Sequence, residues 1–278
     1  MALLDSSAKR KPSPRRKPPV RSKPPAHPKS ATAIDDPLLL HDLADGVLTL
    51  TLNRPDKNNA LSRPLAEAIR KAITAADRNR DVAAIVIAGA GKSFCAGADT
   101  TELRETQNAA AIRRHARLTA DLLQAPRLAR KPVLAAVQGY ALGAGCGLAV
   151  ACDIVVADRE ARLGYPEIRR GIVPALVMPG LVRRVGEARA FALASRAEWI
   201  GSPMARAIGL VDIVCAPGHA VQAAQEQARH LAQQDRTVIA ELKQLLSGLA
   251  RRSGSDAMET AYRLNVRMKL RGAKAKPT

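Results

Sequence analysis

Two short stretches rich in glycine and alanine, SFCAGAD (93–99) and GYALGAGCGLA (139–149), each follow a predicted buried strand. Small residues let backbone N–H groups approach a ligand closely, and the second stretch runs into a predicted helix whose first N–H groups are free. Two such loops facing each other can hold one oxygen between two N–H donors, and each donor of such an oxyanion hole is worth about 3 kcal/mol of barrier. This arrangement suits a thioester carbonyl that becomes an enolate. The alternative is that the small residues only pack a helix against a sheet.

Glu167, in the segment Tyr165-Pro166-Glu167-Ile168, is the candidate acid/base. An apolar pocket raises the pKa of a carboxyl group and makes it a better base, and Ile168, Ile172 and Val173 predict such a pocket. One carboxylate of this kind can move a proton between C2 and C4 of an enoyl thioester. The alternative interpretation places Glu167 on the surface, before a turn.

The hydrophobic pattern predicts the strands and helices that must position these residues. Strands are expected at 47–55, 83–90, 132–139, 152–158 and 210–215. Helices are expected at 61–79, 108–130, 145–151, 174–185, 187–195, 203–208, 217–232, 236–250 and 256–270. Ser62 is expected to cap the first helix, with Pro64 in its first turn. Strands and helices alternate in the first part of the chain, which indicates an α/β fold with a core layered between helices.

Composition divides the chain into three predicted parts. Residues 1–34 form a basic, proline-rich tail, in which residues 1–31 hold nine lysines and arginines against Asp5, a net charge of +8. Such a segment cannot bury apolar area and is expected to stay extended, either as a solubilising tail or as an attractor of polyanions. Residues 35–200 form the core, and 201–278 form a helical segment that we expect to pack against a neighbouring subunit.

Several function classes lack their usual residues. GAGKS (89–93) ends like a phosphate-binding loop, but Val86 stands where the first glycine belongs, and GAGCG (143–147) lacks the third glycine of a dinucleotide site. The four cysteines show no zinc or disulfide pattern, so reduced thiols and no metal are expected. No apolar run is long enough to suggest a membrane span, and no secretory signal is apparent. These features favour a cytoplasmic protein.

Several stretches together resemble the enoyl-CoA hydratase/isomerase (crotonase) family over about residues 40–270. They are 48–62, SFCAGADTTEL (93–103), 132–158, ARLGYPEIRRGIVP (161–174) and ARAIGLVDIV (205–214). The resemblance implies a crotonase-like spiral of β-β-α units with a C-terminal helical segment, assembled as a homotrimer or hexamer. It also implies an acyl-CoA substrate and no separate cofactor, since coenzyme A is part of the substrate.

The resemblance also implies roles for particular residues. The oxyanion donors would be the backbone N–H groups of Ala98 and Ala144, and Glu167 would be the acid/base. Ala144 stands where many members have glycine, a change that leaves its N–H in place. Substrate and CoA binding would fall to Lys57, Asn58, Ala60, Ala96, Gly97, Asp99, Gly143 and Pro166. The alternative for the first three is an ordinary turn after a strand.

One position departs from the family's hydratases, which use a second glutamate where this chain has Gly147. No carboxylate between Asp121 and Asp153 replaces it. Adding water needs one group to orient and deprotonate the water while another protonates carbon, so the sequence favours double-bond isomerisation with Glu167 alone. A 2-enoyl-CoA hydratase is the alternative. The bulky segment Pro174–Met178 also departs from the family and can reshape the acyl pocket.

A further alternative is a catalytically degenerate scaffold that binds polyanions or nucleic acid. The basic tail and the basic residues near the C-terminus favour it: Arg251, Arg252, Arg263, Arg267, Lys269, Arg271, Lys274 and Lys276. No aromatic stacking platform or known nucleic-acid motif accompanies these charges, so we do not expect nucleic acid as a partner.

Overall fold

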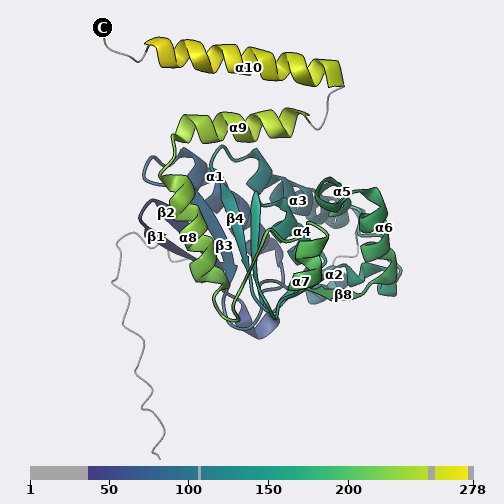
Figure 1. Ribbon diagram of the computed structural model, residues 1–278. Coiled ribbons are helices and arrows are strands. Elements are labelled where there is room, and N and C mark those ends of the chain that lie inside the picture. The colour runs from purple at the N-terminus through teal and green to yellow at the C-terminus, as the bar shows by residue number, and fades with distance from the viewer. Residues whose placement is uncertain (1–36, 106–107, 250–253, 275–278) are drawn as a thin grey trace, which may run out of the picture. The chain divides into compact units, whose positions relative to one another are not determined.

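The computed structural model describes residues 37–105, 108–249 and 254–274 (Figure 1). The tail predicted at 1–34 lies outside the described residues. Within them, no helix combines the length and the apolar character needed to cross a membrane.

A six-stranded sheet forms the centre of the fold, in the order β1-β2-β3-β4-β6-β9. Its strands are β1 (Leu39–Ala44), β2 (Val47–Leu52), β3 (Ala84–Gly89), β4 (Val133–Val137), β6 (Ile154–Asp158) and β9 (Ile213–Cys215). β1 pairs antiparallel with β2, and every other pair is parallel. All residues of β3 and β4 are buried, as expected of parallel strands whose two faces are both covered.

A second sheet of three short strands lies in the order β5-β7-β8, formed by β5 (Tyr140–Leu142), β7 (Arg162–Gly164) and β8 (Trp199–Gly201). The sequence did not predict these strands, because three residues are too few to show a period of two. β5 pairs parallel with β7, with Leu142 opposite Gly164. This pairing holds the two ends of the candidate site, since the second glycine loop follows β5 and Glu167 follows β7.

Ten α-helices lie in the described part of the chain. They are α1 (Arg63–Arg78), α2 (Thr100–Glu105), α3 (Ala109–Leu128), α4 (Ala144–Ala151), α5 (Met178–Val185), α6 (Glu187–Arg196), α7 (Ser202–Ala207), α8 (Ala220–Ala232), α9 (Arg236–Leu249) and α10 (Gly254–Lys274). The predicted helices are confirmed with small shifts at their ends. Ser62 caps α1 as predicted, because its Oγ accepts a hydrogen bond from the N–H of Leu65 at 3.4 Å.

Helices cover both faces of the large sheet (Figure 1). On one face, Ala220, Ala224 and Ala228 of α8 pack against the side chains of β2, β3, β4 and β6. On the other face, buried side chains of α1, α3, α4 and α5 form the larger core. The residues after 200 therefore contribute to the core as well, because β9 adds a strand and α8 covers a face.

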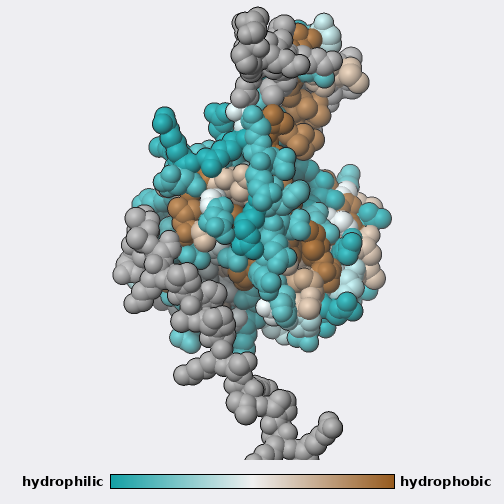
Figure 2. All heavy atoms as spheres, turned by 60° about the vertical axis from the view of Figure 1, so that its left-hand side comes forward, coloured by the Kyte–Doolittle hydropathy of each residue, from teal (hydrophilic) through white to brown (hydrophobic). Residues whose placement is uncertain are grey.

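The last two helices carry hydrophobic side chains at the surface. The exposed ones are Val238, Leu242 and Leu246 on α9, and Met258, Tyr262 and Val266 on α10. In Figure 2, patches of hydrophobic residues (brown) stand out from a surface that is mostly hydrophilic (teal). α9 is attached to the core through Lys243, whose Nζ lies 2.6 Å from Asp153 Oδ2 and donates to the backbone oxygens of Pro126 and Lys131.

Candidate active site

The first glycine loop leaves one N–H group unused. Leu61 donates to Gly97 O at 2.8 Å, and Asp99 donates to Leu61 O at 3.1 Å, which makes a short parallel bridge between Leu61 and Ala98. In such a bridge the middle residue points its N–H to the other side. Accordingly, no acceptor for the Ala98 N–H is found among the described residues.

The second glycine loop ends at the start of α4. Gly143 donates to Gly164 O at 2.8 Å and adopts φ +53°, a left-handed conformation that favours glycine. Ala144 is then the first residue of α4, so its N–H has no partner within the helix and finds none elsewhere in the described chain. The positive end of the helix dipole adds to the attraction for an anion at this point.

The two loops lie against each other. Cys95 donates to Tyr140 O at 2.9 Å, and Leu142 donates back to Cys95 O at 3.0 Å. A Cβ atom added to Gly97 would lie 2.7 Å from Leu142 O and 3.6 Å from the nitrogen of Ala144. Ala98 and Ala144 also line the same small cavity. The arrangement therefore presents two free N–H groups on neighbouring loops.

Glu167 reaches this point from the 3-10 turn Pro166–Arg170. Its Oε1 lies only 2.5 Å from where a Cβ on Gly143 would be, so the carboxylate approaches the start of α4 closely. Its Oε2 is buried and has no hydrogen-bond partner in the described part of the chain. Burial raises the pKa of Glu167, against smaller opposing effects of its own backbone N–H and of Arg170.

The prediction that Ile168, Ile172 and Val173 build an apolar pocket around Glu167 is wrong. Their side chains are 46%, 49% and 75% exposed. They follow Glu167 in a tight turn and an extended segment, which direct them to the surface while Glu167 points inward. The carboxylate instead packs against Gly143 of the second glycine loop.

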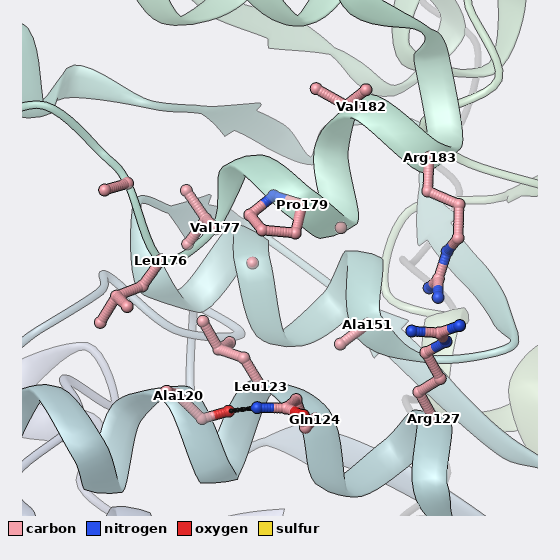
Figure 3. Close-up of a pocket in the computed structure, with 13 residues that line it drawn as sticks. Ala120, Leu123, Gln124, Arg127, Ala151, Leu176, Val177, Pro179, Val182 and Arg183 are labelled. Atoms are coloured by element: carbon pink, nitrogen blue, oxygen red, sulfur yellow. Dashed lines mark hydrogen bonds between the residues drawn. The ribbon is translucent and has the colours of Figure 1, made fainter. Parts of the chain in front are cut away.

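Gly147 lies one turn further along α4, where a side chain has no room. A Cβ at this position would lie 2.4 Å from Cγ1 of Val177, which is itself buried. Leu123 approaches from α3 on the other side, at 3.4 Å (Figure 3). Gly147 and Val177 are therefore complementary: the valine fills the space that a side chain at 147 would need.

Most of the residues predicted to bind coenzyme A lie at the turn after β2 or on the first glycine loop, whereas Gly143 precedes α4 and Pro166 begins the 3-10 turn after β7. Lys57 is exposed, while Asn58 accepts a hydrogen bond from Ser93 Oγ at 3.1 Å through its side chain and from Ala96 N at 2.9 Å through its backbone. Ala60, Gly97 and Pro166 are buried or half-buried close to these loops. The structure thus places the predicted binding segments beside the candidate oxyanion hole.

Asp99 holds the first loop in place through its side chain. It forms an ion pair with Arg54 at 2.8 Å and accepts the N–H of Thr101 at 3.0 Å at the start of α2. Burial alone would raise the pKa of Asp99, but the hydrogen bonds from Arg54, Thr101 and Glu102 lower it below its usual value. We therefore expect Asp99 to act on a ligand through the loop that it holds.

Two residues that hold this loop were missed by the sequence analysis. Arg54 donates to Ala60 O at 2.6 Å in addition to its pair with Asp99. Asn59 is completely buried, and its side chain donates to the backbone oxygens of Ala90 and Ser93. Asn59 has a positive φ of +55°, a conformation that asparagine adopts in turns more readily than most residues. Its residue type was therefore the one signal of this role in the sequence.

The cysteines that flank the two loops are packing residues. Cys95 and Cys146 are fully buried, and burial raises the pKa of each thiol to about 12. Neither is a nucleophile at neutral pH. Among the described residues, no group of three or more His, Cys, Asp or Glu side chains is arranged to hold a metal ion.

Comparison with known proteins gives a consistent assignment. Residues 42–271 match the model of the enoyl-CoA hydratase/isomerase family. The chain is 37% identical over 226 residues to a putative enoyl-CoA hydratase of Thermus thermophilus, covering 79% of this chain and 88% of that one. It is 41% identical over 189 residues to the 2,3-dehydroadipyl-CoA hydratase of Escherichia coli, covering 66% and 73%.

Solved structures agree with this result. The enoyl-CoA hydratase of Mycobacterium smegmatis superimposes with a TM-score of 0.79 at 32% identity, covering 82% of this chain and 89% of that one. A putative enoyl-CoA hydratase of Streptomyces coelicolor gives 0.79 at 31% identity, covering 88% and 90%. The fold is therefore the crotonase fold, and the chain belongs to the enoyl-CoA hydratase/isomerase family.

Proposed function

We propose that the protein shifts the double bond of an enoyl-CoA thioester, with Glu167 as its single acid/base. The observation that carries this proposal is the buried carboxylate of Glu167 beside the start of α4, together with the closed position at Gly147. The backbone N–H groups of Ala98 and Ala144 would hold the thioester oxygen. The segments around Asn58 and Ala96 would hold the coenzyme A part of the substrate.

The chemistry needs one proton to leave one carbon and to return to another. The Glu167 carboxylate removes a proton from C2 of a 3-enoyl thioester, and the electron pair moves onto the thioester oxygen to form a dienolate. The two N–H groups stabilise the negative charge on that oxygen. Protonated Glu167 then returns the proton to C4, the double bond forms between C2 and C3, and the carboxylate is regenerated.

The raised pKa of Glu167 supports this role. A buried carboxylate without a charged partner is a stronger base than an exposed one, and its protonated form is more readily kept until the proton is returned. The buried Oε2 has no hydrogen-bond partner in the described chain, so no protein donor competes for this oxygen as the proton acceptor.

Hydration of a 2-enoyl-CoA is the second candidate, and the names of relatives favour it. One relative is the short-chain-enoyl-CoA hydratase of Clostridium acetobutylicum, 37% identical over 187 residues. The pair Gly147 and Val177 argues against hydration. Residue 147 carries no carboxylate that could orient a water molecule at this point of α4, and Val177 occupies the space beside it.

One assay separates the two candidates. Purified protein is given 3-enoyl-CoA and 2-enoyl-CoA in parallel, and isomerisation and hydration are followed by product analysis. We expect isomerisation, which falls by about 10²- to 10⁴-fold in Glu167→Gln because general acid–base catalysis is lost. The binding of a saturated acyl-CoA should persist in this variant. Strong hydration that survives Glu167→Gln would contradict the proposed mechanism.

We further infer that the chain assembles as a homotrimer or hexamer. The exposed hydrophobic side chains of α9 and α10 support this, since such surface is commonly covered by another subunit. Light scattering coupled to size-exclusion chromatography tests it: a mass of one chain at micromolar concentration would contradict it.

A further inference from the structure

A pocket of about 640 Å³ lies between α3, α4 and α5, outside the residues assigned above to catalysis. One end of it is apolar and is lined by Leu123, Leu176 and Val177, and the other end is lined by Arg127 and Arg183 (Figure 3). Its volume is within the range of small-molecule sites. A pocket that is apolar at one end and cationic at the other fits an aliphatic chain that ends in an anion.

The apolar end begins close to the candidate oxyanion hole. Gly147 lines the pocket and lies three residues after Ala144 on α4, and Ala151, which lies beside the arginines, comes one turn later. Because α4 rises about 1.5 Å per residue, the pocket extends along the helix to about 10 Å from Ala144. We take an acyl chain whose thioester oxygen is held at Ala144 to enter this pocket beside Gly147, which lines it.

The two arginines are less directly compensated than Arg184 and Arg54, although Asp153 does act on the charge of Arg183. Arg184, the next residue, forms an ion pair with Asp212 at 2.7 Å, and Arg54 pairs with Asp99. In the described part of the chain neither Arg127 nor Arg183 forms an ion pair. Figure 3 shows their guanidinium groups pointing towards each other from α3 and α5.

The two arginines differ in exposure, since Arg127 is half-buried and Arg183 is exposed at the surface end of the pocket. The Nε of Arg127 is buried and has no hydrogen-bond acceptor among the described residues, although its Nη2 donates to Ser247 O at 2.8 Å. Burial, and then the nearby charges of Arg127 and Arg184, lower the pKa of Arg183. A carboxylate between the two guanidinium groups would accept their N–H groups in charge-assisted hydrogen bonds and would relieve the repulsion between them.

We propose that Arg127 and Arg183 form a subsite for a carboxylate at the far end of the acyl chain, so that the enzyme prefers acyl-CoA substrates with a terminal carboxylate over those that end in a methyl group. This inference rests on the proposed function, because it takes the acyl chain to start at Ala98 and Ala144. A phosphate of coenzyme A is the other possible source of an anion, and the experiment below distinguishes the two.

The test measures the dissociation constants of saturated acyl-CoA thioesters, which cannot react, by titration calorimetry. A series of chain lengths is used in two matched forms, one ending in a carboxylate and one in a methyl group. For the wild type we expect the carboxylate form to bind at least about tenfold more tightly at one chain length, the effect of charge-assisted hydrogen bonds to both arginines. Equal affinities at every length would overturn the proposal.

Substitutions then locate the effect. Arg183→Met, at the surface end of the pocket, should reduce the ratio of the two dissociation constants to near one. Arg127→Met should do the same, and its melting temperature is measured alongside because Arg127 also bonds to α9. The matched control is Arg130→Met, which removes the same charge from an exposed position three residues away and should leave the ratio unchanged. If Arg183→Met instead weakens both forms equally, the arginines bind the coenzyme A phosphates and the subsite does not exist.

The test distinguishes a failure of the carboxylate subsite from a failure of the proposed isomerase function. Isomerisation of a methyl-ended 3-enoyl-CoA without any preference for the carboxylate would leave the proposed function in place and overturn the subsite. A carboxylate preference in binding that is lost in Arg183→Met would support the subsite even if the reaction catalysed were hydration.

Discussion

At the scale of single residues, the site depends on close contact between a carboxylate and a glycine. Glu167 can lie beside the free N–H of Ala144 only because residue 143 has no side chain. Burial at this place raises the pKa of the carboxylate, so the position of Glu167 in the site and its basicity are linked. The ionised carboxylate therefore lowers the stability of the folded state while it makes Glu167 a stronger base.

Because of this loss of stability, Glu167→Gln is expected to be more stable than the wild type at neutral pH. A buried carboxyl group whose pKa is raised in the folded state destabilises that state when it is ionised. This loss of stability is complete above the pKa in the folded state, and it disappears below the pKa in the unfolded state, about 4.3. The free energy of unfolding, measured by urea denaturation from pH 4 to 8, should favour the variant increasingly as pH rises. A wild type that is the more stable protein at pH 8 would contradict the burial argument.

Gly143→Ala is expected to disturb catalysis more than folding. A Cβ at this position would lie 2.5 Å from Glu167 Oε1, so the carboxylate must move, and misplacement of a catalytic group costs about 10²-fold in rate. The positive φ adds about 1 kcal/mol of backbone strain or more.

The control for Gly143→Ala is Gly218→Ala, which has a positive φ of +77° but open space around the added atom. It should show the loss of stability without the loss of isomerisation rate. Equal rates in the two variants would mean that Glu167 does not depend on its contact with Gly143.

At the scale of helices and strands, the short helix α4 provides both the N–H of Ala144 and the closed position at Gly147. A glycine inside a helix costs about 1 kcal/mol relative to alanine, so its presence at 147 needs a reason. The reason is Val177, in the segment before α5, whose Cγ1 occupies the place of a side chain at 147. The sequence showed both departures from the family's hydratases separately, and the packing of α4 against this segment relates them.

Gly147→Ala and Val177→Ala should therefore be strongly coupled. Alone, Gly147→Ala overpacks the contact with Val177 and should cost about 1–3 kcal/mol of unfolding free energy. In the Val177→Ala background the same change should cost less or be neutral, because the contact with Cγ1 at 2.4 Å is gone, while the Cβ of residue 177 at 3.1 Å and Leu123 at 3.4 Å remain to offset the gain in helix propensity.

Urea denaturation of the four proteins of this cycle measures the coupling. Gly248→Ala in α9 is the matched control, because an added Cβ there meets nothing within 4 Å, and it should be neutral or stabilising in the wild-type background. Additive effects of Gly147→Ala and Val177→Ala would show that Val177 does not close the position.

At the scale of the whole molecule, the large sheet carries the loops and α9 is joined to it by one buried lysine. The Nζ of Lys243 contacts the carboxylate of Asp153 just before β6, the backbone oxygen of Pro126 in α3, and that of Lys131 just before β4. Asp153 in turn accepts the N–H of Val133 at 2.8 Å. This network connects a helix late in the sequence to two neighbouring strands of the sheet.

Lys243→Met is expected to destabilise the protein by about 1–3 kcal/mol, because it removes a buried donor from the backbone oxygens of Pro126 and Lys131 and from the partly exposed carboxylate of Asp153. Asp153→Asn combined with Lys243→Met should recover part of the loss. Lys71→Met is the control, since Lys71 makes an exposed i,i+4 pair with Glu67 and should cost no more than about 0.5 kcal/mol. Urea denaturation reports the free energies, and an equal loss in the two lysine variants would contradict the role of this network.

The sequence by itself determined the family, the α/β core and nearly all of the longer elements. Strands such as β3 and β4 are uniformly apolar, and helices such as α1 repeat apolar residues with their own period, so these elements are encoded locally. The glycine loops and Glu167 were also visible, because their residue types are specific to the chemistry.

Only the tertiary structure decided which of these residues meet. The contacts of Gly143 with Glu167, of Gly147 with Val177 and of α9 with β6 join residues that are far apart in the chain. Such contacts depend on how whole elements pack, and no local period records them. The same reason explains the error at Ile168, Ile172 and Val173, whose apolar character suggested a pocket although the turn after Glu167 directs them to the surface. It also explains why Arg127 and Arg183, in separate helices, were not recognised as a pair until the packing of α3 and α5 brought them together.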